Sequence, residues 1–230
     1  MSPTAHREPR EPREPREPRE FYDSQYHYED DAARPDEKRI WHALRYLQPI
    51  AGTDLLDLGC GAGWATRLAK VEGHANHVVG IDFSRAGLDL ARRHTPQQIL
   101  WVQADGTALP LADSALDRLF CNGALEHFPD VRRGIGEIAR VLKPAARAVL
   151  IVPNFYVKTE QPMEFRTHYW GWKKLLEQHG LQVAKTAIDW GPPIFKNADL
   201  KRAVARLVGK MLCMIPFMQY QFIFVVVRQR

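Results

Sequence analysis

The stretch Asp54-Leu-Leu-Asp-Leu-Gly-Cys-Gly-Ala-Gly-Trp64 decides the fold of this chain. A short apolar run ends at Leu58 and is followed by glycines at every second position, which are Gly59, Gly61 and Gly63. Glycine lets the backbone turn sharply and lets a ligand approach the main chain. The pattern predicts a buried strand over 55–58, a tight loop and a helix over 64–71. The free N–H groups and the positive dipole end of that helix would face a bound ligand.

The spacing of these glycines distinguishes two kinds of nucleotide site. A dinucleotide fingerprint reads G-x-G-x-x-G and would place its third glycine at position 64, where the helix packs closely against the strand. Position 64 is tryptophan in this sequence, so the spacing is G-x-G-x-G. The pattern therefore disfavours an oxidoreductase that uses a nicotinamide cofactor, which remains a rival interpretation. A tight turn in an unrelated α/β protein is a further alternative.

Strand and helix patterns alternate on both sides of the glycine loop. The expected helices span 36–47, 64–71, 84–94, 131–142 and 170–179, with Pro144 ending the fourth of them; the expected strands span 55–58, 78–82, 99–103, 117–121, 148–152, 181–188 and 222–227. Such alternation implies parallel strands joined by right-handed crossovers. The expected fold class is α/β, a doubly wound sheet with helices on both faces.

Polar side chains follow three successive strands after the glycine loop. Asp82 ends the second strand, 23 residues after Gly59, while Asp105 follows the third strand and Asn122 the fourth. The carboxyl ends of parallel strands meet at one edge, where open α/β sheets bind ligands. Asp82 could accept hydrogen bonds from both hydroxyls of a ribose, and Asp105 could meet an adenine amino group. Asp82 could instead cap the next helix, although Ser84 already provides a cap.

Five ordered motifs carry a family resemblance, namely LLDLGCGAGW (55–64), GIDFS (80–84), ADGTALPLAD (104–113), NGALEHFPD (122–130) and EIARVLKP (137–144). Together they resemble the class I S-adenosylmethionine-dependent methyltransferases, and most closely the type 11 group that includes quinone and natural-product methyltransferases. The resemblance covers about residues 20–152. It implies a Rossmann-like, doubly wound sheet of seven strands, mostly parallel with an antiparallel last strand. The segment Pro144-Ala145-Ala146 departs from the family, which usually has a glycine pair before the fifth strand.

The resemblance also implies a cofactor, S-adenosyl-L-methionine, and the residues that hold it. These residues are Asp57, Gly59, Gly61, Gly63 and Asn122 around the methionine part, Asp82 at the ribose, and Phe83, Asp105 and Gly106 at the adenine. The Asn/Asp-Pro-Pro-Tyr motif expected for amino methylation of adenine or glutamine is missing, because residues 122–125 read NGAL. The Pro-Cys nucleophile of cytosine methylation is also missing, because Cys121 follows Phe120.

The acceptor side of the site is predicted from the chemistry of methyl transfer. A sulfonium is already an activated methyl donor, so the enzyme mainly aligns the nucleophile with the S–CH3 bond. An oxygen or carbon nucleophile can also require removal of a proton, and His127 is the predicted base; alternatively, it only shapes the site. The candidate acceptor-binding residues are Tyr22, Arg166, His168 and Tyr169. Arg166 could bind an anionic group or simply lie on the surface.

Composition limits the partners of the chain. Its 230 residues carry a net charge of +5, but residues 196–230 hold seven Lys/Arg and one Asp and so account for +6. A basic segment on an otherwise near-neutral fold argues against nucleic acid as a partner. The expected acceptor is a small molecule or a lipid- or glycan-linked molecule, and a catalytically silent cofactor-binding regulator or partner protein is the alternative. The three cysteines are far apart in the sequence, so no metal site is expected. A reducing, cytoplasmic setting is also expected, because no disulfide framework is indicated.

The two ends of the chain show different patterns. Residues 7–20 repeat Arg-Glu-Pro, which suits polyproline II, so residues 1–20 are expected to form a disordered tail and residues 21–230 the methyltransferase domain. Residues 200–214 read as an amphipathic helix with three basic side chains on one face. This helix is expected to cover the sheet. The alternative is a weak, peripheral contact of residues 200–215 with an anionic membrane surface. The apolar stretch 211–227 contains Pro216, which favours a helix end and a strand over a membrane span.

Overall fold

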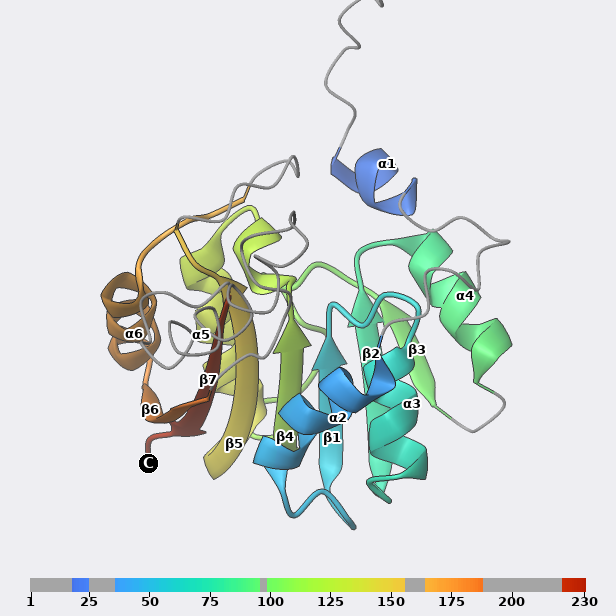
Figure 1. The fold of residues 1–230 in the computed structure, drawn as a ribbon, viewed down its shortest axis with the longest axis horizontal. Coiled ribbons are helices and arrows are strands. Elements are labelled where there is room, and N and C mark those ends of the chain that lie inside the picture. Colours follow the sequence, from blue (N-terminus) through green and yellow to red (C-terminus); the bar gives the residue numbers. More distant parts are fainter. Residues whose placement is uncertain (1–17, 25–35, 96–98, 156–163, 188–220) are drawn as a thin grey trace, which may run out of the picture.

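A single seven-stranded sheet organises the part of the chain that the computed structural model describes, which is residues 18–24, 36–95, 99–155, 164–187 and 221–230. The strand order is β3-β2-β1-β4-β5-β7-β6 (Figure 1). Strand β7 runs antiparallel to β5 and to β6, whereas the other neighbouring strands pair in parallel. The Rossmann-like α/β fold with an antiparallel last strand is therefore confirmed.

The bounds of the elements agree closely with the sequence pattern. The strands are β1 (Asp54–Leu58), β2 (His77–Asp82), β3 (Leu100–Gln103), β4 (Leu116–Asn122), β5 (Leu142–Pro153), β6 (Leu181–Ala187) and β7 (Gln221–Arg228). The helices are α1 (Pro18–Asp23), α2 (Glu37–Leu44), α3 (Trp64–Val71), α4 (Arg85–His94), α5 (Val131–Val141) and α6 (Tyr169–Gln178), with 3-10 turns η2 (Arg45–Leu47) and η3 (Leu125–His127). The helix expected over 200–214 lies outside the described residues.

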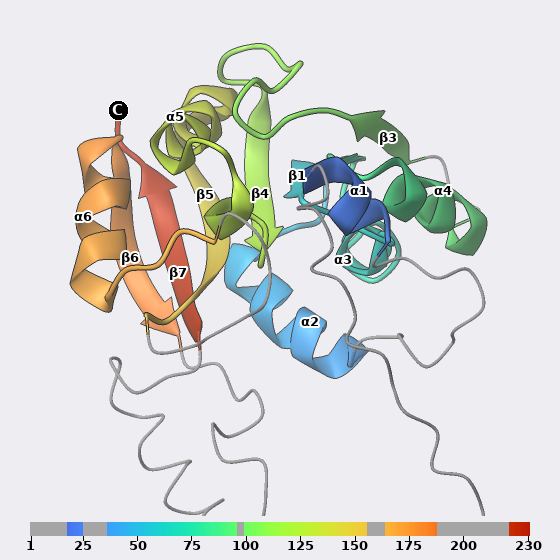
Figure 2. The same cartoon turned by 90° about the horizontal axis from the view of Figure 1, so that it is seen from above.

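The central strands, such as β1 and β5, are buried on both faces, because helices pack on each side of the sheet (Figure 2). Successive side chains of a strand point to opposite faces. Val149 and Ile151 of β5 accordingly join the cluster formed with α2 and α3, whereas Ala148 and Leu150 join the cluster formed with α5 and α6. Two separate apolar layers, one on each face, thus hold the sheet in place.

The start of β5 differs from the expected one. The helix ends at Val141, and β5 begins at Leu142 instead of residue 148. Leu142 pairs with Leu116, and pairing then resumes between Arg147 and Arg118 after an irregularity. Ala145 lies in this irregular segment with a φ of +63°. A proline such as Pro144 is tolerated at a bulge because the ladder does not need its N–H there, so the segment continues as strand instead of forming a separate loop.

The N-terminal boundary also needs a correction. Helix α1 begins at Pro18, inside the segment that the repeat assigned to a disordered tail. Proline is compatible with the first turn of a helix, where its missing N–H would have no intrahelical partner. The structure does not describe residues 1–17. Among the residues it does describe, no helix has the length and apolarity needed to span a membrane.

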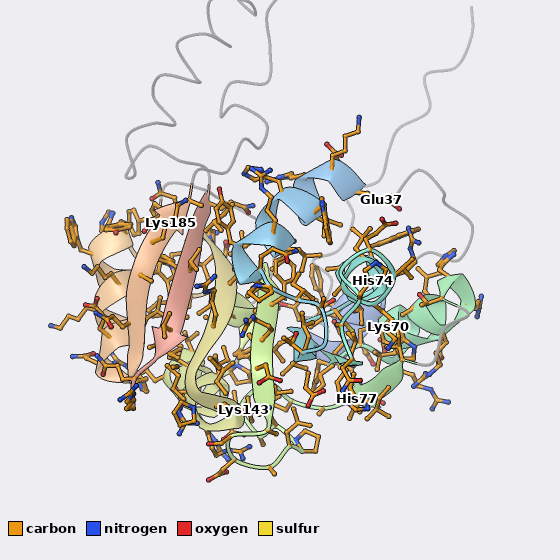
Figure 3. All side chains as sticks on the ribbon, turned by 90° about the horizontal axis from the view of Figure 1, so that it is seen from below. Glu37, Lys70, His74, His77, Lys143 and Lys185 are labelled. Atoms are coloured by element: carbon orange, nitrogen blue, oxygen red, sulfur yellow. The ribbon has the colours of Figure 1, made fainter. Side chains whose placement is uncertain are left out.

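The edge where the parallel strands begin is occupied by polar contacts that hold the fold together (Figure 3). Lys143 Nζ donates to Asp117 Oδ1 at 2.8 Å, and His77 Nδ1 lies 2.8 Å from Asp54 Oδ1. Lys70 Nζ donates to two backbone carbonyl oxygens in the turn before β2. These side chains fix the starts of the strands, so the residues available for chemistry are those at the opposite edge.

Candidate functional site

The glycine loop after β1 has a backbone conformation that residues with a side chain rarely adopt. Gly59, Gly61 and Gly63 have φ angles of +74°, +50° and +77°. The Gly59 N–H donates to the Ile81 carbonyl oxygen at 2.8 Å, which fastens the loop to β2. A Cβ atom at Gly59 would come within 2.2 Å of the Ala124 Cβ. The loop therefore lies directly against the segment that follows β4, with no room for a side chain between them.

Asp82 connects this loop to helix α4. Its Oδ2 accepts a hydrogen bond from the Gly61 N–H at 2.7 Å, and its Oδ1 accepts one from the Ser84 N–H at 2.8 Å. Burial raises the pKa of Asp82, and the backbone N–H donors oppose that shift. Each carboxylate oxygen has a second lone pair, so the group could still accept hydrogen bonds from a ligand.

Asp57 links the end of β1 to helix α3. This buried carboxylate accepts a hydrogen bond from the Thr66 hydroxyl at 2.5 Å. Burial raises the pKa of Asp57 to about 7, while the Thr66 hydroxyl acts in the opposite direction. Asp57 therefore orients the first turn of α3, whose N-terminus begins at the glycine loop.

The residues predicted at the adenine end have clear structural reasons of their own. Asp105 Oδ1 accepts hydrogen bonds from the Thr107 N–H at 2.8 Å and from the Thr107 hydroxyl at 2.9 Å, which closes the turn after β3. A Cβ atom at Gly106 would lie 2.1 Å from the Phe128 ring, so only glycine fits there. Phe83 is 43% exposed, with the Arg19 guanidinium 5.9 Å from its ring centroid. Phe83 is thus a partly exposed ring beside Asp82 with a cation over it.

Side chains from α1 and η3 meet on the other side of the glycine loop. The ring centroids of Tyr22 and His127 are 5.8 Å apart, and His127 Nε2 lies 3.8 Å from Glu126 Oε1. Burial raises the pKa of Glu126 to about 8, and the nearby Glu164 adds to the shift. Burial and then the Glu126 charge raise the pKa of Tyr22 to about 12. The sequence-predicted pair Tyr22 and His127 is thus brought together beside a carboxyl group that the sequence analysis did not select.

Comparison with known proteins agrees with this geometry. Residues 56–150 match the family model described as a methyltransferase domain. The chain is 36% identical over 123 residues to the 2-phytyl-1,4-naphtoquinone methyltransferase of Nostoc punctiforme, covering 50% of this chain and 54% of that protein. It is also 36% identical over 116 residues to the demethylmenaquinone methyltransferase of Clavibacter sepedonicus, covering 49% and 46%. Residues 56–150 therefore carry a methyltransferase domain of the type 11 group. The chain spans about half the length of these two relatives.

A solved structure extends the likeness in fold over most of the chain. One chain of the complex between the Haloferax volcanii Trm112 methyltransferase activator and a methyltransferase superimposes with a TM-score of 0.72 at 23% identity. The match covers 91% of this chain and 98% of that chain. The fold of the methyltransferase domain therefore extends beyond the residues that the family model matches.

The segment before α6 adds a partner to one residue predicted on the acceptor side of the methyltransferase domain. The Arg166 guanidinium donates two hydrogen bonds to Glu164 Oε2, at 2.9 Å from Nε and 2.5 Å from Nη2. The Glu164 side chain is itself buried. Arg166 is therefore paired with a buried carboxylate, and a role in binding an anionic group of the acceptor stays a prediction. The Phe165 N–H donates to the Glu126 carbonyl oxygen at 2.7 Å and holds this segment against η3.

The remaining predicted residues have other surroundings in the structure. The Tyr169 ring packs against Phe224 of β7, and its hydroxyl lies 3.1 Å from Thr186 Oγ1 of β6. His168 is exposed at the start of α6, with its ring centroid 4.4 Å from that of Phe155. Asn122 is exposed at the end of β4. Among the described residues, no group of three or more His, Cys, Asp or Glu side chains is arranged to hold a metal ion.

The sequence analysis missed Glu126 and Glu164. Glu126 stands inside the quoted motif NGALEHFPD, and its apolar neighbours Leu125 and Phe128 were the available signal for burial. Glu164 lies in an irregular segment, where no periodic pattern indicates which residues are buried. The pairing of Glu164 with Arg166 follows from the folded structure and has no signal in the sequence.

Proposed function

We propose that this chain is an S-adenosyl-L-methionine-dependent methyltransferase that acts on a small molecule carrying a quinone-type ring. The observation that supports the proposal best is the braced glycine loop, because Asp82 ties it to α4 and leaves carboxylate lone pairs for a ribose. The family match of residues 56–150 supports the same reading and weighs against a nicotinamide-dependent oxidoreductase.

The residues at the carboxyl edge fit the cofactor. The methionine part would be held by Gly59, Gly61 and Gly63, with Asp57 and Asn122 beside them. Asp82 would hold the ribose, and Phe83, Asp105 and Gly106 the adenine. When bound, the cofactor would supply an electrophilic methyl group on a positively charged sulfur. The buried carboxyls of Asp57 and Asp82 lie beside the glycine loop, where a positively charged sulfur would favour their ionised forms.

The acceptor class is supported by the names of the relatives and by exposed apolar side chains around the end of β5 and the start of α6. The two relatives described above are named as methyltransferases of 2-phytyl-1,4-naphtoquinone and demethylmenaquinone. In this chain large apolar side chains are exposed at Phe155 after β5, at Phe165 before α6 and at Trp170 in the first turn of α6, where a ring or its apolar substituent could pack. A peripheral membrane contact through residues 200–215 and a cytoplasmic location remain predictions.

The proposal is tested in two steps. Calorimetry with S-adenosylmethionine and with NAD should show binding of the first ligand only. Transfer of a labelled methyl group to 1,4-naphthohydroquinone should then separate an enzyme from a silent cofactor-binding regulator. Binding without transfer to this ring or to a cell extract would favour the regulator, and binding of NAD alone would reject the proposal.

A further inference from the structure

The Glu126 carboxyl carries one of the buried polar atoms that lack a hydrogen-bond partner in the described part of the site. The residue is only 5% exposed, and its Oε2 has no hydrogen-bond partner among the described residues. A buried polar atom without a partner costs free energy, so its presence calls for an explanation. A ligand that supplies the missing hydrogen bond is one explanation.

The position of this carboxyl points to the acceptor. Glu126 lies in η3, two residues after Ala124, which contacts the glycine loop at Gly59. Among the described residues, a Cβ atom built on the exposed Gly123 would have only Glu126 Oε1 within 4 Å, at 3.9 Å. The Glu126 carboxyl therefore lies beside the exposed end of β4, next to the loop that would hold the methionine part of the cofactor.

A second unsatisfied group complements it. The hydroxyl of Tyr22 in α1 is also buried without a hydrogen-bond partner among the described residues, and it lies within electrostatic reach of Glu126. Because the pKa of Tyr22 is raised to about 12, this hydroxyl keeps its proton at neutral pH and can donate it in a hydrogen bond. A single hydroxyl group of a ligand could donate a hydrogen bond to the carboxylate oxygen and accept one from the phenol.

We propose that Glu126 is the residue that binds the acceptor and takes its proton, and that the acceptor presents a neutral ring hydroxyl to Glu126 Oε2 and the Tyr22 hydroxyl. This inference rests on the proposed methyltransferase function and goes beyond it by naming the reacting group. It also assigns the role of base to a residue other than the sequence-predicted His127.

The chemical step balances with the groups on the protein. The O–H bond of the acceptor breaks, and its proton forms a new O–H bond on the ionised Glu126 carboxylate. The released electron pair forms a bond from the hydroxyl oxygen, or from the ring carbon conjugated with it, to the methyl carbon. On the carbon route, that carbon then loses its own hydrogen as a proton and a proton returns to the ring oxygen, which restores the aromatic ring. The methyl C–S bond breaks with its electron pair retained on sulfur, which becomes a neutral thioether. No oxidant, reductant or metal ion is required.

The surrounding charges favour a neutral acceptor over an anionic one. Glu126 is faced by Tyr22 from α1, Cys121 from β4, His127 from η3, and Glu164 with its partner Arg166 from the segment before α6. Arg166 is neutralised by Glu164, so a carboxylate or phosphate on the acceptor near Glu126 would meet like charge. Glu126 must be ionised to act, so activity should rise with pH toward about 8 and then level off.

The experiment compares wild type with Glu126→Gln, Glu126→Asp, His127→Asn and the surface control Glu177→Gln. Each variant is first assayed for S-adenosylmethionine binding by calorimetry and for its melting temperature. Methyl transfer is then measured from pH 6 to pH 9 with 1,4-naphthohydroquinone and with 1,4-dihydroxy-2-naphthoate as its anionic counterpart. We expect Glu126→Gln to bind the cofactor within about twofold of wild type, to lose about a hundredfold in kcat, and to lose the rise with pH.

The control variants decide between a chemical and a structural role. Glu126→Asp should keep the rise with pH at an intermediate kcat, and Glu177→Gln should match wild type. A Glu126→Gln protein with wild-type kcat and pH profile overturns the proposal, as does loss of the pH-dependent rise in His127→Asn alone. Equal or better turnover of the anionic acceptor overturns the acceptor class. If wild type fails to bind S-adenosylmethionine, the proposed function fails, which is a separate result.

Discussion

Asp23 of α1 accepts a hydrogen bond from the Ser84 hydroxyl at 2.5 Å, across 61 residues of chain. The same Asp23 oxygen accepts a hydrogen bond from the Ala86 N–H at 3.2 Å, while the Ser84 oxygen accepts one from the Gly87 N–H at 3.1 Å. This shared contact attaches α1 to the first turn of α4, immediately after Asp82. Helix α1 thereby lies over the carboxyl ends of the strands (Figure 2). Its Tyr22 ring lies 5.8 Å from the His127 ring, between centroids.

Replacing Asp23 with alanine should loosen α1. We expect the free energy of unfolding to fall by about 1–2 kcal/mol, because Ser84 Oγ and the Ala86 N–H lose their partner. We also expect S-adenosylmethionine to bind several-fold more weakly, since α1 covers the site. Asp36→Ala is the matched control, because Asp36 caps α2 by accepting from the Lys38 N–H and should lose a similar stability with unchanged affinity. Equal affinities in the two variants would show that α1 does not contribute to binding.

Deletion of the N-terminal segment should have a sharp boundary. Removing residues 2–17 should leave the melting temperature and the cofactor affinity nearly unchanged, because the repeat contains no apolar residue to bury. Removing residues 2–24 should lower both, because Tyr22 and Asp23 are lost with α1. Thermal melting and calorimetry on the two proteins test this directly. A clear loss of stability in the shorter deletion would mean that the repeat itself packs on the fold.

The sequence was most informative where a local pattern has one physical outcome. Helix α3 has the predicted bounds, Trp64–Val71, because the left-handed Gly63 immediately before it ends the loop. Helix α4 begins after Ser84 because the serine side chain caps it, as expected. The position of Asp82 beside the glycine loop follows from parallel strands meeting at one edge. Local propensity and strand alternation together therefore determined the sheet and placed Asp82 beside the glycine loop.

The acceptor half depended on contacts between residues that are distant in sequence or lie in irregular backbone. The bond between Asp23 and Ser84 joins two segments that carry no shared pattern. The pair Glu164 and Arg166 gives the arginine a partner, a buried carboxylate, that the sequence did not indicate. The early start of β5 at Leu142 was missed because proline and alanine at 144–146 have low strand propensity, and pairing with β4 overrides that preference.

Asp82→Ala should weaken both the cofactor site and the fold. The variant loses the acceptor of the Gly61 and Ser84 N–H groups, together with the predicted hydrogen bonds to the ribose. We expect a loss of about 2–4 kcal/mol in S-adenosylmethionine binding by calorimetry. Asp105→Ala is the comparison, because that carboxylate is bonded within its own turn to Thr107 and should cost less affinity. Unchanged affinity in Asp82→Ala would reject the ribose assignment.

Ala145→Gly should be neutral or stabilising, which is unusual for a change to glycine. Ala145 is exposed with a φ of +63°, a conformation that costs an L-residue about 1–2 kcal/mol. Glycine removes that cost but adds about 0.4–1 kcal/mol of entropy to the unfolded chain, so a gain of up to about 1 kcal/mol is expected. The neighbouring Ala146 is buried and has no positive φ, so Ala146→Gly should lose about 0.5–1 kcal/mol. Chemical denaturation of both variants measures the difference.

The buried carboxyls predict that the ligand-free protein loses stability as the pH rises through neutrality. Burial raises the pKa of Glu126 from 4.5 to about 8 and that of Asp57 from 3.8 to about 7. Between the unfolded and folded pKa values the native state holds a proton that the unfolded chain has released. The free energy of unfolding therefore falls with increasing pH in that window, by up to about 1.4 kcal/mol per pH unit for each such group.

Glu126→Gln should remove the contribution of Glu126 to this pH dependence of the free energy of unfolding. The amide has no proton to release, so the variant should match wild type near pH 5 and exceed it near pH 8 in urea denaturation without ligand. Glu137→Gln is the contrasting control, because the Arg140 guanidinium lowers the pKa of Glu137 and its ionised form stabilises the fold throughout this range. That variant should be destabilised equally at pH 5 and pH 8. A Glu126→Gln protein with the same pH slope as wild type would show that Glu126 is already ionised at neutral pH. The rise of activity toward pH 8 would then have to come from another group.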